Sequence, residues 1–569
     1  MLLSLALAVT LAPSLGGCIV QDDQAADEDN WGIPEGGFSN GDPLGKADSI
    51  GVPGPLVATN TSDTQVWNAK NKWEDKDTPA ARAAGIAWDQ NSGLNWDEKY
   101  AKWIESMPRQ HSVDYFDTFT LTTPWGKKVP APKLECSEMA MFLRITFAAW
   151  YELPFYLTAT DSQGTRVYFG HFGARTATSR YANTPLYARA YTDYSSMTAA
   201  QVMQNWPKDA KLRARGLVPN DDDEEMIAPG ARAGAYFDEV HLNKRVGHFL
   251  ILALDYFGSM NLADSRNMYN LKPEALREGD VLLERWQKNG IGHTLVVKEV
   301  KQLGAGQIEA QLASGSMPRR QPKWEDGTAS KQYFTSDQTG GVGKNYEGDA
   351  YAKLGGGIKR FRVTKNINGR WTNTWMSADE ASWVNDTDYN AVGARPKRFE
   401  SLLGEQSPEQ VRASLLQMIA DARSHLAEYP GSCSARENRE KAFAALYTVN
   451  QDKFGVSRAQ TDKQNRKVDD YVFAELEYVK SKTCCWNSTT AGMYQIIMDY
   501  NKSLQQTACV KPVVFKAAKN GGYDVFAAYA LQTGRASQWK PWHEDEPCAQ
   551  RDVQEDAVVD VGATAYCSL

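Results

Sequence analysis

The chain has 569 residues, of which 42% are hydrophobic and 23% are charged, as in an ordinary globular protein. This length is sufficient for two or three domains. The formal net charge is −7 and no basic stripe runs along the sequence, which argues against nucleic acid as a partner. Aromatic residues make up 11% of the chain; a buried core explains them better than exposed surfaces that stack on sugars or peptides.

The N-terminal segment predicts export. Residues 2–15 are mostly apolar, and the stretch is shorter than the roughly 20 residues that a membrane-spanning helix needs. It fits the core of a signal peptide. Leu15-Gly16-Gly17-Cys18 resembles a bacterial lipobox, which implies that Cys18 carries a lipid and begins the mature chain. An ordinary signal peptide with a coincidental cysteine is the alternative. Because no Lys or Arg precedes the apolar run, the true start of the chain stays open.

Residues 19–75 are expected to form a flexible tether. The segment opens with an acidic run and continues with Gly, Pro and polar residues, so it offers little apolar surface to offset the entropy of ordering. Trp31 and Trp67 leave a second interpretation open, a loop packed on the next domain.

Because Ile19 rather than Asp follows Cys18, analogy with lipoprotein sorting favours the outer membrane of a cell envelope, on either the periplasmic or the surface face.

A lone cysteine stands at the start of a predicted helix. After Cys136, apolar residues recur at helical spacing at Met139, Phe142, Leu143, Phe147 and Trp150. A cysteine at a helix N-terminus lies in the positive end of the helix dipole, which favours the thiolate that a cysteine hydrolase uses as nucleophile. A buried structural cysteine is an equally good interpretation of Cys136 alone.

Three strands are predicted further along the chain. They cover residues 276–283, residues 292–297 with His293 at the start, and residues 307–312 after a turn at 304–306. If these strands form a meander, His293 and Glu309 are expected to be neighbours across the ladder. A base that is oriented by a polar partner and faces a thiol follows the logic of a catalytic triad. Gln311 shares a face with Glu309 and is a weaker candidate for the same role.

These elements together resemble the papain-like superfamily of cysteine hydrolases, most of all its NlpC-type cell-wall peptidase branch. That branch has Asp-Cys-Ser-Gly at the nucleophile, where this chain has Glu135-Cys136-Ser137-Glu138. Gly279-Asp280-Val281, Gly292-His293 and Ile308-Glu309-Ala310 match its strands. The resemblance covers roughly residues 110–325. The long separation between the helix and the Gly-Asp strand departs from compact members, so an insertion is expected at about residues 160–270.

The resemblance implies an α+β domain over residues 76–395, in which the nucleophile helix packs on an antiparallel sheet. It implies that Cys136 is the nucleophile, that His293 is the general base and acid, and that Glu309 orients His293. The backbone N–H of Cys136 is a candidate oxyanion donor. A glutamine six residues before the nucleophile, as in papain, is absent because Pro130 occupies that position.

Other polar groups give weaker signals. His248 lies in an apolar run and is more typical of a core histidine, although the insertion could bring it to the cleft. Ser137 is a further secondary candidate, and His171 lies in an aromatic loop that could line a pocket. No spacing of His, Cys and carboxylates predicts a metal site, and the acidic run at residues 221–225 lacks the EF-hand pattern. No metal and no cofactor are therefore expected.

Residues 396–569 are predicted to form a helical domain that carries disulfides, after an irregular connector at 364–400. Ser407-Pro408-Glu409-Gln410 and Ser434-Ala435-Arg436-Glu437 are typical of capping boxes, and further helical patterns follow at 468–479 and 490–504. In an exported chain the six late cysteines are expected to pair: Cys433, Cys484, Cys485, Cys509, Cys548 and Cys567. A nucleophilic Cys136 must then stay unpaired.

Three functional hypotheses remain open at this point. The first is an exported, lipid-anchored thiol hydrolase that cleaves a peptide or amide bond, with peptidoglycan suggested as substrate by family analogy alone. The second is a non-catalytic surface-binding or scaffold lipoprotein that keeps the fold. The third is an acyltransferase or transglutaminase that uses the same triad. The expected partners are a peptide-like substrate and, through the lipid anchor, a membrane; the oligomeric state is open.

Overall fold

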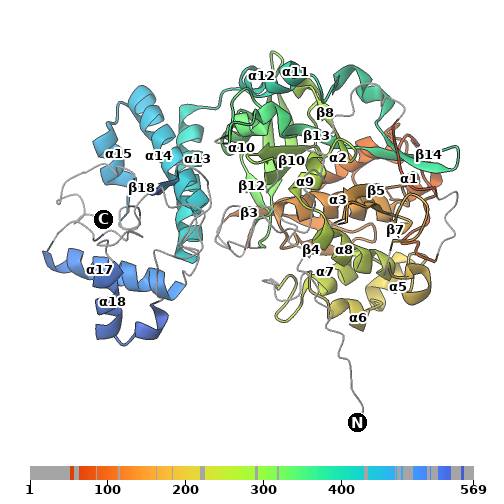
Figure 1. The fold of residues 1–569 in the computed structure, drawn as a ribbon, viewed down its shortest axis with the longest axis horizontal. Coiled ribbons are helices and arrows are strands. Elements are labelled where there is room, and N and C mark those ends of the chain that lie inside the picture. Colours follow the sequence, from red (N-terminus) through yellow and green to blue (C-terminus); the bar gives the residue numbers. More distant parts are fainter. Residues whose placement is uncertain are drawn as a thin grey trace, which may run out of the picture.

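Figure 1 shows the computed structural model of the chain, in which an α+β part lies beside a smaller, mainly helical part. The structure describes residues 51–56 and 63–467, except 85, 113–115, 162, 182–183, 218–224, 289–291, 317–318, 346 and 429–432. Beyond these it describes residues 470, 476–478, 491–508, 513, 523–539 and 553–555. The signal peptide, Cys18, Trp31 and most of the late cysteines lie outside the described residues.

A seven-stranded antiparallel sheet is the centre of the α+β part. Its strands, in spatial order, are β12 (Lys323–Glu325), β11 (Gln307–Ser314), β10 (Gly292–Gly304), β9 (Val281–Arg285), β13 (Gly357–Phe361), β8 (Met268–Leu271) and β16 (Trp383–Val384). The predicted meander is confirmed, since β9, β10 and β11 are neighbours. β10 is longer than predicted, because it continues beyond Val297 to the turn at residues 304–306.

Side-chain alternation gives the sheet two buried faces. Val281, Leu283 and Val296 pack in the core that contains helix α3 (Cys136–Trp150). Leu282 and Leu295 point the other way, because successive residues of a strand face opposite sides. That second face packs against α10 (Gly327–Phe334) and α12 (Arg395–Leu402). The sheet is therefore enclosed between two helical layers.

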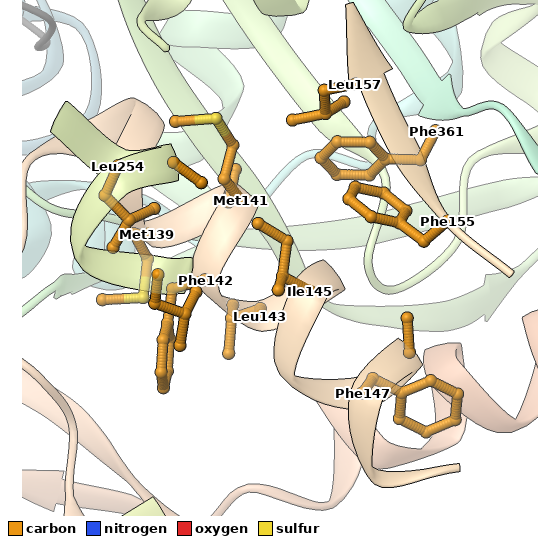
Figure 2. Packing of buried hydrophobic residues seen from close by; sticks show 14 of the residues in the cluster. Met139, Met141, Phe142, Leu143, Ile145, Phe147, Phe155, Leu157, Leu254 and Phe361 are labelled. Atoms are coloured by element: carbon orange, nitrogen blue, oxygen red, sulfur yellow. The ribbon is translucent and has the colours of Figure 1, made fainter. Parts of the chain in front are cut away.

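Helix α3 begins at Cys136, as predicted. Its N-cap residue is Glu135, and the Glu138 carboxylate accepts a hydrogen bond from the Glu135 N–H at 2.8 Å, which satisfies a donor at the helix start. Every residue from Cys136 to Ala148 is buried. Apolar side chains occur all round the helix, as expected for a core helix, and its few polar residues, Glu138 and Arg144 among them, are buried with them. Figure 2 shows how α3 packs against α8 (Lys244–Tyr256), β5 (Tyr156–Thr160) and β13. The labelled side chains in this contact include Met139, Phe142, Leu143, Ile145, Phe147, Phe155, Leu157, Leu254 and Phe361.

Part of the expected tether packs on the domain. Trp67 and Trp73 are buried, and their indole N–H groups donate to the carbonyl oxygens of Leu153 and Pro154 at 2.8 and 2.7 Å. β1 (Val52–Pro53) also pairs with β15 (Arg370–Thr374). The packed-loop interpretation therefore holds for residues 63–75, because the two indoles supply the apolar surface that the earlier, acidic residues lack.

The region expected to be an insertion holds short elements around α8. One small sheet contains β5, β6 (Arg166–Gly170) and β7 (Gly173–Arg175). The helices that follow are α4 (Tyr187–Ala190), α5 (Ala199–Gln204), α6 (Ala210–Arg213), α7 (Ala233–Val240) and α9 (Ser259–Ala263). Before α3 lie α1 (Pro79–Ala84), α2 (Trp96–Ser106) and a sheet of β2 (Arg109–His111), β3 (Asp117–Thr122) and β4 (Lys128–Pro130).

The predicted irregular connector at residues 364–400 is wrong. It contains β14 (Val363–Ile367), β15, α11 (Tyr389–Gly393) and most of α12. Phe399 and Leu402 of α12 are buried in the core beneath the sheet. The α+β part therefore extends past residue 396, since these apolar side chains anchor α12 to it.

The C-terminal part is mainly helical, with α13 (Pro408–Glu428), α14 (Cys433–Phe454), α15 (Arg458–Asn465), α17 (Ala491–Ala508) and α18 (Tyr523–Gln532). The Ser407–Gln410 capping box is confirmed, with reciprocal bonds at 3.0 and 3.2 Å. The second box is not at a helix start, because α14 already begins at Cys433. β17 (Leu476–Tyr478) pairs with β18 (Val553–Glu555), so the part is not wholly helical, and β17 replaces part of the helix predicted at 468–479.

Helix α13 lies against α10 of the α+β part (Figure 1). Within the described residues, no helix combines the length and apolar character needed to cross a membrane.

Candidate active site

The segments that carry the papain-like resemblance meet at one end of the sheet. The Cys136 sulfur lies 3.9 Å from the carbonyl oxygen of Gly292, which is 156 residues away in the chain. The Ser316 N–H donates to the Leu134 carbonyl oxygen at 3.3 Å. Gly315 permits this approach, because a Cβ atom there would lie 2.1 Å from the Leu134 carbonyl oxygen. The helix start therefore lies directly against the ends of β10 and β11.

Cys136 is buried and oxidised in this structure. Its residue exposure is 0%, and its sulfur is held in a disulfide. The expectation that Cys136 stays unpaired is therefore wrong for this form of the protein. Within the described part of the chain, no hydrogen bond joins the sulfur to the His293 ring.

His293 faces a cavity of about 270 Å³ between the sheet and the C-terminal helices. Tyr333 of α10 lies beside the imidazole, with 6.1 Å between the ring centroids. Glu284, Ser314 and Ser316 line the cavity from the sheet side. The opposite wall comes from α13 and α14. We call this space the His293 cavity.

The His293 imidazole is neutral in this setting. It is buried, its Nδ1 has no hydrogen-bond partner among the described residues, and burial together with the nearby Arg320 guanidinium lowers its pKa to about 3. A neutral imidazole can accept a proton from a thiol, but general-base catalysis is most efficient when the pKa lies near the working pH. A functioning base at this position needs a negative group or an opened, hydrated cavity to raise its pKa.

The structure does not bring Glu309 to His293. Glu309 lies opposite Lys301 in the β10–β11 ladder, and Gln311 lies opposite Glu299. Lys301 is eight positions along β10 from His293, a separation of roughly 26 Å in an extended strand. The predicted neighbourhood of His293 and Glu309 is therefore wrong, because β10 runs on beyond the predicted strand and leaves Glu309 close to the turn.

Glu284 is the carboxylic residue that the register places beside His293. The two residues are directly paired across β9 and β10, and both line the His293 cavity. Side chains of directly opposite residues lie on one face and within contact range. Sequence reasoning missed Glu284 because it searched the strand after His293. The available signal was a single acidic residue on the face of Leu282, directly after three apolar residues of the strand.

Two buried carboxylates surround the start of α3. Arg319 binds Glu138 through two hydrogen bonds of 3.0 and 2.7 Å, and its Nη2 lies 3.6 Å from Glu135. The three side chains are at most 2% exposed. One guanidinium thus contacts two carboxylates next to Cys136, and negative charge at a helix start opposes the effect of the helix dipole on a thiolate.

The secondary candidates lie away from the cavity. His248 stacks on Tyr191 with 3.7 Å between ring centroids, and burial lowers its pKa to about 4. Ser137 is fully buried, and its hydroxyl has no hydrogen-bond partner in the described ranges. Gln311 donates to Glu309 and accepts from the Trp324 indole, each at 2.7 Å. These contacts give all three residues a structural setting.

Two other residues of interest are also structural. His171 is buried, and its Nδ1 lies 3.0 Å from the Phe155 carbonyl oxygen. Asp280 of the Gly-Asp element accepts hydrogen bonds from Arg360 at 2.6 and 2.8 Å, which joins β9 to β13. In the described residues, no group of three or more His, Cys, Asp or Glu side chains is arranged to hold a metal ion.

Comparisons with family models, with curated proteins and with solved structures give no match to this chain. The chemistry of the site therefore has to be inferred from its own residues.

The buried His293 predicts a pH dependence of stability. Its pKa is about 3 in the folded state and about 6.5 when unfolded. The unfolded state therefore binds a proton more readily below pH 6.5, and folding loses free energy as the pH falls towards 3. Between pH 7 and pH 5 this group alone costs about 2 kcal/mol. Urea unfolding at the two pH values measures this cost. Between pH 7 and pH 5 the free energy of unfolding of His293→Gln should fall by about 2 kcal/mol less than that of the parent. Equal losses would contradict the burial of a neutral imidazole.

Proposed function

We propose that the chain is an exported, lipid-anchored thiol hydrolase whose nucleophile is stored in a disulfide. The supporting observation is the approach of the Cys136 sulfur to 3.9 Å from the Gly292 carbonyl oxygen, one residue before His293. A cysteine at a helix start and a histidine at a polar cavity are the two groups that nucleophilic acyl chemistry requires. His293 lies on the β10 face of Leu295, α3 packs on the other face, and Cys136 does not line the cavity, so the thiol must move to reach the imidazole. Its papain-like character, its export and its lipid anchor belong to the same proposal.

Activation requires a dithiol reductant. The dithiol transfers two electrons and two protons to the two sulfurs of the Cys136 disulfide and itself becomes a disulfide. The freed thiol must then turn towards the His293 ring, with which it shares no hydrogen bond in the closed form. This step separates an inactive, oxidised chain from an active, reduced one.

The acyl chemistry then follows in two halves. His293 accepts the thiol proton, the sulfur attacks the acyl carbon, and the C–N bond breaks as His293 returns the proton to the leaving amine. Water next attacks the thioester, which releases the carboxylic acid and restores the thiol. If an amine takes the place of water, the same site performs transfer. Helix-start N–H groups near Cys136 are the candidate donors to the oxyanion.

A second candidate function is a non-catalytic binding protein that keeps this fold. The observation that favours it is the disulfide on a fully buried Cys136. In this case Cys136 is a structural cysteine, and the His293 cavity is a ligand site without acyl chemistry.

Activity of the reduced chain on purified peptidoglycan and on a library of acylated peptides tests the proposal. We expect new amino and carboxyl groups to appear only after a dithiol is added, with mass spectrometry identifying the bond that breaks. Added methylamine separates the two reactions, because a transferase yields the methylamide in place of the acid. Turnover that is equally fast before reduction, or that persists without Cys136, would contradict a thiol mechanism.

Two glutamates provide a matched test of the site's geometry. In the reduced chain, Glu284→Gln should lower kcat/KM by at least about tenfold, because it removes the carboxylate paired with His293 across the ladder. Glu309→Gln should stay within about twofold, because Glu309 lies opposite Lys301. The pH profile of kcat/KM for the Glu284 variant should also shift to lower pH. The reverse order of effects would restore Glu309 as the orienting residue.

A further inference from the structure

The His293 cavity is closed by helices of the C-terminal part. Ala422 and His425 of α13 and Asn438 and Lys441 of α14 line it opposite the sheet. Helix α13 is fastened by an ion pair of 2.7 Å between Lys323 and Asp421 and by a hydrogen bond of 2.8 Å from Ser414 to Asp326. The C-terminal helices are therefore a wall of this site.

Arg320 brings a positive charge to the cavity without a carboxylate partner among the described residues. Its Nη1 donates to the carbonyl oxygens of Ser314 at 3.5 Å and Gln321 at 3.0 Å, and its guanidinium lies 4.8 Å from the Phe116 ring centroid. Carbonyl oxygens satisfy single donors but leave the charge unneutralised. Since a guanidinium has five N–H donors, Arg320 keeps donors available for an anion.

The other cation of the same wall is already occupied. Lys323 lies 3.0 Å from Glu325 and 2.7 Å from Asp421, and these carboxylates raise its pKa. An added anion would gain little from Lys323. Arg320 is therefore the better site for a negative group on the sheet side of the cavity.

His293 gives an independent indication of a ligand. It is only 7% exposed, it lines the cavity, and its Nδ1 has no partner in the part of the chain that the structure describes. A buried polar atom without a hydrogen bond costs about 1–3 kcal/mol, so native proteins rarely leave one without a role. A polar group in the cavity would satisfy it.

We propose that the His293 cavity binds the free carboxyl end of a short peptide, with its carboxylate on Arg320. A planar carboxylate matches the fork of a guanidinium. Glu284, Glu325 and Asp421 also line the cavity, so an anion with two charges, such as phosphate, is disfavoured more strongly than a single carboxylate. A volume of about 270 Å³ admits a ligand of one or two residues. This inference concerns binding and does not depend on the catalytic proposal.

Titration of the oxidised full chain with two probes tests the inference. The probes are N-acetyl-dialanine and its C-terminal amide, which differ in one charge, and binding is measured by ligand-observed NMR. We expect the acid to bind at least about tenfold more tightly than the amide, as for other charge-assisted pairs, and Arg320→Gln to abolish this difference. Arg398→Gln is the matched control, since Arg398 is exposed and pairs with Glu274 outside the cavity.

A second variant tests the helical wall. Lys441→Glu reverses a charge on α14 at an exposed position of the cavity lining, so it should weaken the acid several-fold and leave the amide unchanged. The inference is overturned if the acid and the amide bind equally, or if Arg320→Gln keeps the preference for the acid. Because the oxidised chain cannot turn over a substrate, failure here is distinct from failure of the hydrolase proposal.

Discussion

In the reduced chain, Cys136→Ser is expected to lower the rate of amide hydrolysis by at least about 10³-fold. The effect is large because the nucleophile is removed, while binding in the His293 cavity contributes only a residual rate. The measurement is the initial rate of product formation from whichever acylated peptide the reduced parent cleaves.

Ser137→Ala and His248→Gln are the matched controls for this prediction. Ser137 is the neighbour of Cys136 in α3, and His248 stacks on Tyr191 away from the cavity. Both variants should retain activity within about threefold, provided that they fold. If Cys136→Ser keeps the parent's rate, the nucleophile is another group and the thiol mechanism fails.

The second large effect is on stability. Arg319→Met should lower the free energy of unfolding by about 3–5 kcal/mol, because it leaves Glu138 and Glu135 buried without their cation. Urea unfolding of the oxidised chain measures this loss, with the fluorescence of the buried tryptophans as the signal.

Two comparisons make the stability prediction specific. Combining Arg319→Met with Glu138→Gln should recover much of the loss, since the neutral amide no longer needs a cation. Arg398→Met removes an exposed ion pair with Glu274, whose side chains are 51% and 48% exposed, and should cost at most about 1 kcal/mol. Equal losses for the Arg319 and Arg398 variants would mean that the charges at the start of α3 are solvated.

The local elements were largely predictable from the sequence. Helical spacing after Cys136 located α3, and the apolar runs around residues 281 and 295 located β9 and β10. These patterns are local, since a buried helix and a buried strand each repeat their apolar residues at a fixed period. The approach of Cys136 to the His293 ring was predicted through the family resemblance. In the described residues the sulfur instead lies against the Gly292 carbonyl oxygen and forms no hydrogen bond to the ring.

The register of the strands around His293 and the oxidation state of Cys136 could not be predicted from local sequence patterns. The partner of His293 depends on where each hairpin turns, and a long β10 moved Glu309 away and left Glu284 in its place. The disulfide of Cys136 depends on which distant cysteine the fold brings near, and spacing along the chain carries no information about that. The contribution of α13 and α14 to the cavity likewise arises only from tertiary packing.

If the proposed function is correct, the Cys136 disulfide controls when the enzyme is active. A thiol enzyme in an oxidising compartment needs protection of its nucleophile from irreversible oxidation. A disulfide that a dithiol can reverse supplies such protection and keeps the chain inactive until a reductant acts.

Alkylation of Cys136 in the folded protein tests the central proposal most directly. The chain is treated with a mild dithiol at neutral pH and pulsed with iodoacetamide, and the peptide that contains residue 136 is quantified by mass spectrometry. We predict no label before reduction, rapid labelling afterwards, and slower labelling in His293→Gln, because the imidazole accepts the thiol proton. If Cys136 remains unlabelled in a reduced and still folded chain, or reacts only after unfolding, it is a structural cysteine and the hydrolase proposal is wrong.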